Sequence, residues 1–141
     1  MAIQLSEKLM DEIHQHAKLD FPHECCGVMV GLAKGDDKQI TLLHRASNTH
    51  EDGHERRYLI SPDELRAIDK SARANGATII GIYHSHPNHP SIPSGYDKEW
   101  AWPWYSYIIV SVMDGIPTNT TSWVLLDDRS AFEPESITIN P

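Results

Sequence analysis

The chain carries the stretch TIIGIYHSHPNHPSIPSGYD at residues 78–97. Its first part, residues 78–83, is rich in β-branched side chains, which favours a buried strand that ends at His84. Three prolines then stiffen the connection that follows. Ser94 comes next, a residue type that commonly caps the start of a helix. A buried strand, a stiff loop and a helix in this order predict a domain of mixed α/β type.

Patterns on both sides of this stretch predict further helices and strands. Ser6 caps a helix whose apolar residues repeat every four positions and which ends before Pro22. Ser61, with Pro62 at the first helical position, opens a second helix that ends at Asn75-Gly76. We expect one α/β domain over residues 1–141, with a central, mainly antiparallel or mixed sheet flanked by helices. The other predicted strands are residues 28–32, 39–44, 58–60, 106–112, 122–126 and 132–139, and residues 46–57 are predicted to be a surface loop.

Composition limits the classes of partner. The 141 residues include 20 acidic and 12 basic side chains, for a net charge of −8, which argues against a nucleic-acid partner. No apolar run is long enough to predict a membrane span, so no membrane partner is expected. The two cysteines, Cys25 and Cys26, are adjacent and form no disulfide framework, which favours a reducing, cytoplasmic compartment.

A candidate metal site follows the central strand. His84 and His86 are two residues apart, so on an extended strand end their imidazoles share one face. Asp97, at the start of the next helix, can fold back to add a carboxylate. Two imidazoles and a carboxylate match the three protein ligands of catalytic zinc, with the fourth position left for water. Taken alone, Ser94 and Asp97 would be read as a helix cap and a first-turn acid, and His89 as a rim residue or a fourth ligand.

The spacing His-x-His, seven residues, Ser, two residues, Asp resembles the JAMM motif of the MPN-plus metalloproteases. That family also has a glutamate before a glycine-punctuated strand, and FPHECCGVMVG at residues 21–31 places Glu24 there. Residues 99–107 resemble the compact bacterial branch, some members of which process ubiquitin-like sulfur-carrier proteins in the manner of CysO-cysteine peptidases. The resemblance implies a JAMM/MPN fold of the cytidine-deaminase-like type.

The resemblance also implies roles for single residues. His84, His86 and Asp97 would bind one Zn²⁺ per chain, and Glu24 would act as general base and then acid. Ser94 would donate a hydrogen bond to the developing oxyanion. The implied substrate is a sulfur-carrier protein with a Gly-Gly tail, from which an amino acid, first of all cysteine, is released. A homodimer is compatible with this expectation.

Other readings stay open. A non-catalytic MPN module would serve protein interaction, but such modules lack the metal ligands that this chain has. An isopeptidase acting on larger ubiquitin-like conjugates is a further alternative, whereas a zinc deaminase would need His-x-Glu and Pro-Cys-x-x-Cys, which are absent. Cys25 and Cys26 are expected to be core thiols rather than nucleophiles. Trp100, Trp102 and Trp104 are expected to lie mostly in the core and the wall of the site.

Overall fold

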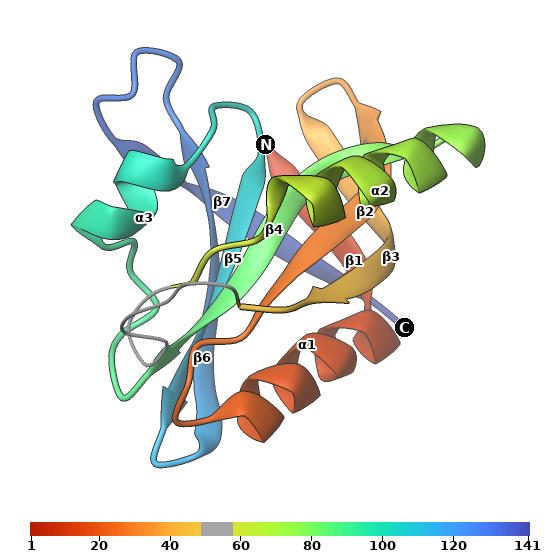
Figure 1. The fold of residues 1–141 in the computed structure, drawn as a ribbon. Helices are drawn as coiled ribbons and strands as arrows, with labels where there is room; N and C mark the ends of the chain where they lie inside the picture. The colour runs from red at the N-terminus through yellow and green to blue at the C-terminus, as the bar shows by residue number, and fades with distance from the viewer. Residues whose placement is uncertain (49–57) are drawn as a thin grey trace.

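The computed structural model describes residues 1–48 and 58–141. Three helices and seven strands follow one another along the described chain, which ends with three consecutive strands (Figure 1). The elements, in chain order, are β1 (Ala2–Ser6), α1 (Glu7–Asp20), β2 (Cys26–Lys34), β3 (Asp37–Ala46), α2 (Pro62–Ala74), β4 (Thr78–Pro87), α3 (Gly95–Trp100), β5 (Ser106–Met113), β6 (Ile116–Leu125) and β7 (Phe132–Asn140).

The strands form one mixed sheet that closes on itself in the order β1-β3-β2-β4-β5-β6-β7. The β1–β3, β1–β7 and β4–β5 pairs are parallel, and the remaining neighbours are antiparallel. The expectation of an α/β domain with a mixed sheet and helices is confirmed, but the sheet is a closed barrel and not a central layer flanked by helices. The reason is β1, which pairs with β3 on one side and with β7 on the other, so that neither strand is left as a free edge.

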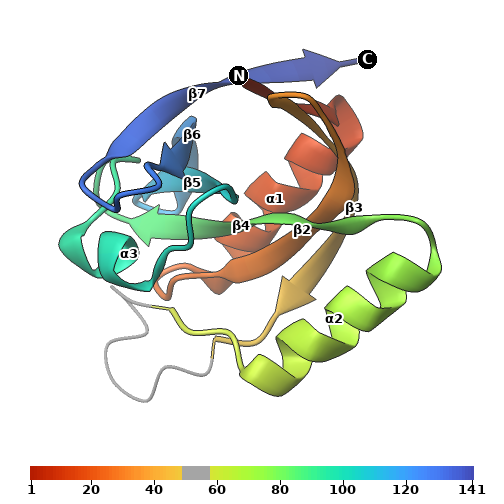
Figure 2. The same cartoon turned by 90° about the horizontal axis from the view of Figure 1, so that it is seen from above.

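The two longer helices lie on opposite sides of the strands. Figure 2 shows α1 on the concave side of the curled sheet and α2 on the other side of β2 and β4. Met10, Ile13 and Ala17 of α1 belong to the larger apolar core, together with strand residues such as Ile3 and Ile80. A second apolar cluster packs α2 against the outer face of the sheet and includes Ile68, Ala72, Ile79 and Ile82. Together the two cores hold β4, the strand with the candidate metal ligands, between packed layers.

Local signals predicted most of these elements. Ser6, Ser61 and Ser94 each cap a helix, and each side-chain oxygen accepts a hydrogen bond from a backbone N–H in the first turn. Residues 58–60 are not a strand, which corrects that prediction. The loop predicted at residues 46–57 lies outside the described residues except for 46–48. In the described part of the chain, no helix is both long and apolar enough to cross a membrane.

Candidate metal centre

Strand β4 places the two histidines of the candidate site. It lies between β2 and β5, where His84 pairs with Cys26 on one side and with Ile109 on the other. Because side chains alternate along a strand, His84 and His86 point to the same face. Both are buried, with exposed fractions of 0% and 3%. The backbone of β4 is hydrogen-bonded to β2 on one side and to β5 on the other. This pairing holds the strand segment that carries the two buried imidazoles.

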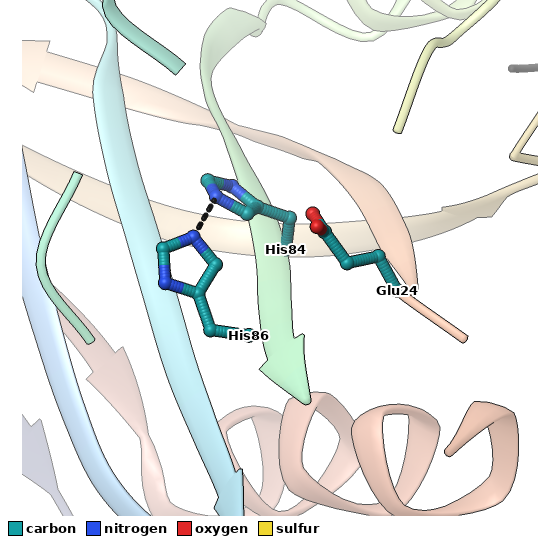
Figure 3. A group of neighbouring side chains, drawn as sticks. All are labelled: Glu24, His84 and His86. Atoms are coloured by element: carbon teal, nitrogen blue, oxygen red, sulfur yellow. Dashed lines mark hydrogen bonds between the residues drawn. The ribbon is translucent and has the colours of Figure 1, made fainter. Parts of the chain in front are cut away.

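Helix α3 brings Asp97 to these imidazoles. The Nε2 atoms of His84 and His86 are 3.2 Å apart, as drawn in Figure 3. The carboxylate oxygens of Asp97 lie 3.0 Å from His86 Nε2 and 3.3 Å from His84 Nε2. Ligand bonds of about 2.0 Å in a tetrahedron give ligand-to-ligand edges of roughly 3.3 Å. The two imidazole nitrogens, and each of them with the Asp97 oxygen that it faces (Oδ2 for His86 and Oδ1 for His84), therefore have the spacing of neighbouring corners of a zinc site.

The protonation pattern of the site also fits a cation. The Nδ1 of His86 lies 2.8 Å from the Pro90 carbonyl oxygen, so this nitrogen carries the proton in the neutral ring. The Nε2 lone pair of His86 then faces an oxygen of Asp97, and a cation between them would satisfy both acceptors. Burial lowers the pKa of His84, although Asp97 acts in the opposite direction. Burial would raise the pKa of Asp97, but the two histidines outweigh it and lower this pKa.

Glu24 stands beside the histidines, just before β2. Its backbone carbonyl accepts a hydrogen bond of 3.2 Å from Asn48 Nδ2, and the next residue, Cys25, is bonded through its N–H to Ser85 Oγ at 2.8 Å. In Figure 3 the carboxylate of Glu24 points toward His84. One ligand atom from each of Glu24, His84 and His86 fits within a mutual distance of 4.8 Å.

Two sets of three residues could bind a metal here, and the distances between their donor atoms distinguish the two sets. A set of Glu24 and the two histidines is looser than the set with Asp97, whose contacts are 3.0–3.3 Å. We therefore take Asp97 as the third donor and Glu24 as a neighbour of the metal position. Glu24 Oε1 has no hydrogen-bond partner among the described residues. Burial, with a smaller contribution from Asp97, raises the pKa of Glu24 to about 9, and a nearby cation would act against this rise.

Ser94 is both a helix cap and a candidate catalytic donor. Its Oγ accepts a hydrogen bond of 3.0 Å from Asp97 N–H, and its own N–H donates to Asp97 Oδ2 at 2.9 Å. This reciprocal capping box fixes the Asp97 carboxylate against the histidines. Since Ser94 Oγ accepts in this contact, its hydroxyl proton can be donated elsewhere. The structure thus shows Ser94 and Asp97 as the cap of α3, and this arrangement is compatible with the roles expected of them in an active site.

The other candidates take different places. The ring of His89 lies 5.1 Å from the ring of His86, outside the closely spaced donors. Cys25 and Cys26 are buried free thiols, as expected, and burial raises the pKa of Cys25 to about 12. The tryptophan prediction is wrong in part, because all three side chains are exposed. These tryptophans lie at and after the end of a helix, where no helix or strand periodicity indicates whether an aromatic side chain is buried or exposed.

Sequence patterns missed one residue of the site. Tyr58 stacks on His84, with ring centroids 4.5 Å apart and ring planes 26° from parallel. It comes from the segment just before α2, which has no regular secondary structure and is far from both motif segments in the sequence. A tyrosine after a polar loop carries no spacing signal, so only the structure reveals this contact.

Comparison with known proteins places the chain in a family. The family model described as prokaryotic homologs of the JAB domain matches residues 6–126. The desampylase of Haloferax volcanii is 32% identical over 112 residues, which cover 79% of this chain and 78% of that protein. The CysO-cysteine peptidase of Mycobacterium tuberculosis is 27% identical over 130 residues, covering 92% of this chain and 86% of the relative. A solution structure of a Desulfitobacterium hafniense protein superposes with a TM-score of 0.85 at 31% identity, covering 98% of this chain and 92% of that one.

These matches confirm the expected JAMM-type peptidase family. The matched range, residues 6–126, includes Glu24, both histidines, Ser94 and Asp97. It also extends from the cap of α1 through the end of β6. The chain therefore belongs to the prokaryotic JAB-domain family, whose named relatives include peptidases.

Proposed function

We propose that residues 1–141 form one zinc metallopeptidase domain that hydrolyses the amide bond after the Gly-Gly tail of a ubiquitin-like sulfur-carrier protein. The observation that carries this proposal is the spacing of two imidazole nitrogens and one carboxylate, 3.0–3.3 Å apart, beside a buried glutamate. In this proposal His84, His86 and Asp97 hold one Zn²⁺. The released residue would be an amino acid, with cysteine as the first candidate.

A zinc ion held by these residues would supply a Lewis acid and would make water available as a nucleophile near neutral pH. Glu24 is the proton carrier, since its carboxylate is beside the histidines and has an oxygen free of partners among the described residues. It takes a proton as the nucleophile attacks and passes it to the leaving amine. The Ser94 hydroxyl donates a hydrogen bond to the substrate carbonyl oxygen as negative charge develops there, a contribution of ~3 kcal/mol.

The proposed substrate class is supported by burial and by the named relatives. The three donor residues have little exposed surface, so the scissile bond must enter a recessed site. Glycines on the acyl side let the substrate backbone approach closely, because they have no side chain to exclude. One relative is named a desampylase, another a CysO-cysteine peptidase and a third a probable TtuB-protein conjugate cleaving protease. An isopeptidase reaction on larger conjugates of a ubiquitin-like protein would use the same chemistry.

Intact-mass spectrometry tests this function directly. A carrier protein ending in Gly-Gly-Cys is incubated with the zinc-loaded protein and with its Glu24→Gln variant. We expect the wild type to remove one cysteine, and the variant to bind zinc but to lose at least ~100-fold in rate. A chelator should stop the reaction and added zinc should restore it.

The outcomes separate the parts of the proposal. A near-normal rate in Glu24→Gln would remove Glu24 from the mechanism. Bound zinc without cleavage of this tail would contradict the substrate class and leave the metal site in place. A wild-type protein that binds no zinc and cleaves nothing would overturn the proposed function as a whole.

A further inference from the structure

Large aromatic side chains are exposed at the end of α3. The exposed fractions are 55% for Trp100 and 66% for Trp102. The ring of Tyr96, which is partly buried, lies 6.0 Å from the ring of Trp100 on the same helix. We call Tyr96, Trp100 and Trp102 the α3 aromatic surface. Tryptophan and tyrosine concentrate at protein interfaces, and exposed apolar groups of this kind mark binding sites.

Tyr96 and Trp100 belong to the same short helix as Asp97, and Trp102 follows two residues after the end of that helix. Asp97 and Trp100 are three residues apart, and helix positions with this spacing lie on neighbouring parts of one face. At 1.5 Å rise per residue, Trp100 lies about 4.5 Å beyond Asp97 along the helix axis. On the other side of Ser94, Ile92 is 62% exposed. Large exposed apolar side chains thus flank the segment that carries Ser94 and Asp97.

Trp104 does not belong to this surface. Its ring packs against Lys38, with the ammonium nitrogen 4.6 Å from the ring centroid. Lys38 also donates hydrogen bonds to the Trp104 carbonyl and to Ser106 Oγ. Trp104 therefore has a partner within the fold, which explains its position near β3 and β5.

The length of the substrate tail limits how far the folded body of the substrate can lie from the site. An extended chain spans at most ~3.5 Å per residue, so a body attached two or three residues before the cleaved bond lies about 10 Å from the metal ligands. We propose, resting on the proposed function, that the α3 aromatic surface binds an apolar patch on the folded body of the ubiquitin-like substrate. The body and the surface are then adjacent whenever the tail occupies the site.

The test compares one tail in two contexts. Substrates are the folded carrier ending in Gly-Gly-Cys and a short peptide with the same last residues, and the variants are Trp100→Ala and Trp102→Ala. We expect the ratio of kcat/KM for the protein to kcat/KM for the peptide to fall at least tenfold, mainly through KM. Ile116→Ala is the matched control, because Ile116 is 64% exposed at the start of β6 and should leave this ratio as in the wild type.

Each result has one meaning. Equal losses on protein and peptide, or no change in the ratio, would overturn the surface and leave the proposed function in place. A wild-type protein that binds zinc but cleaves neither substrate would overturn the surface together with the proposed substrate class, and would leave the metal site in place.

An independent observation concerns the orientation of His84. Ligand histidines are normally held by a hydrogen bond at the second ring nitrogen. His86 has this contact with the Pro90 carbonyl, whereas Nδ1 of His84 has no hydrogen-bond partner among the described residues. The flat contact of His84 is instead with the ring of Tyr58, 4.5 Å away. The geometry points to Tyr58 as the positioning residue for His84, acting by ring stacking.

The backbone next to Tyr58 is tied to the site. Leu59 N–H donates to Asn48 Oδ1 at 3.1 Å, and Asn48 Nδ2 donates to the Glu24 carbonyl at 3.2 Å. Asn48 thus connects the chain beside Tyr58 to the chain of the proton carrier. This link holds the backbone beside Tyr58 close to the backbone of Glu24.

Metal binding tests this role without reference to turnover. Tyr58→Leu should weaken Zn²⁺ binding about tenfold in chelator competition and should change the visible spectrum of the Co²⁺-loaded protein. Tyr58→Phe keeps the ring and should restore both wild-type values. Unchanged affinity and spectrum in Tyr58→Leu, or equal defects in both variants, would overturn the assignment. If Tyr58→Leu fails to fold, Tyr58→Met provides bulk without a flat ring and is judged by the same two readouts.

Discussion

Asp97 combines two tasks in one carboxylate, and they can be separated. It caps α3 by accepting from Ser94 N–H, and it faces both histidine Nε2 atoms. Asp97→Asn keeps an oxygen for the cap but loses the charge, whereas Asp97→Ala loses both. We expect both variants to lose more than ~100-fold in zinc affinity, and only alanine to lose about 1 kcal/mol of stability without zinc. Chelator competition and urea unfolding measure the two effects, and near-normal zinc affinity in Asp97→Asn would contradict the ligand assignment.

The candidate site was predictable to the extent that its residues are close in sequence. His84, His86, Ser94 and Asp97 lie within residues 84–97, so strand alternation and helix capping already bring them together. Glu24 reaches the site through tertiary pairing of β2 with β4, and only the family resemblance indicated it. Tyr58 has neither a local pattern nor a motif position, so its contact with His84 depends on the fold alone.

Strands β4 and β5 approach each other closely at Gly81. A Cβ atom added there would lie 1.9 Å from the Ser106 carbonyl oxygen and 2.8 Å from Met29 Cε. Because the nearest atom belongs to the backbone of a paired strand, neither strand can move aside without breaking the ladder. We expect Gly81→Ala to lower the free energy of unfolding by about 3 kcal/mol, the upper end of the usual overpacking range. Urea unfolding provides the measurement.

Gly95→Ala is the matched control for Gly81→Ala. Gly95 is the first residue of α3, and an added Cβ there would meet nothing within 4 Å. Its effect should stay within about 1 kcal/mol, since alanine is the better helix former. Equal, small effects of the two substitutions would show that β4 and β5 are packed less tightly than the structure has them.

Helix α1 is joined to β4 by a buried polar contact that should make stability depend on pH. His16 Nδ1 lies 2.6 Å from the Tyr83 hydroxyl, and burial lowers the pKa of His16 despite the opposing effect of Asp20. The unfolded chain, with the ordinary pKa of 6.5, therefore takes up a proton before the folded chain does. The stability from neutral His16 is complete above pH 6.5 and is lost as the pH falls through the lower folded pKa.

His16→Gln tests this linkage, because glutamine can still bond the Tyr83 hydroxyl but does not titrate. The variant should be less stable than the wild type by about 1 kcal/mol at pH 7.5, and the difference should shrink toward pH 5. Urea unfolding at both pH values gives the comparison. A difference that stays constant with pH would mean that His16 does not contribute to acid destabilisation.

Elements were predictable where a local signal marks their ends. Serine caps located the starts of all three described helices, and β-branched runs located the cores of β4 and β5. Residues 58–60 have strand-like composition but pair with no strand in the described structure, since their place is against α2 and the metal site. A high strand propensity means that side chains suit the surface of a sheet, but it does not show that a neighbouring strand is available for pairing.

At the scale of the whole molecule, closure of the sheet was the feature that sequence patterns could not predict. It depends on β1, a five-residue strand that runs parallel to both β3 and β7. Ile3 and Leu5 point into the core, but an alternation of two apolar residues is too short to indicate a partner strand. The exposure of the tryptophans was not predicted either, because large aromatic residues are assigned to the core when no binding partner is known.

The metal site joins three separate parts of the molecule, so zinc binding should stabilise the whole fold. Its donors come from β4 and α3, and Glu24 comes from the segment before β2. A ligand that binds only the folded state at 100 times its Kd adds ~2.7 kcal/mol. For a domain of this size that corresponds to a rise in Tm of roughly 8 °C. Because the donors are already held by strand pairing and the capping box, the far-ultraviolet circular dichroism spectrum should stay the same when zinc is added.

Differential scanning calorimetry with and without zinc measures this linkage, and magnesium is the control ion. Magnesium prefers six oxygen ligands, so two imidazoles and one carboxylate should give it little affinity and little shift in Tm. Asp97→Asn should lose most of the zinc-dependent rise, because the charged donor is gone while the cap remains. An equal rise with magnesium, or an undiminished rise in Asp97→Asn, would place the stabilising ion outside the histidine pair. A rise in Tm that is specific to zinc and depends on Asp97 would show that the metal site proposed for catalysis also stabilises the whole fold.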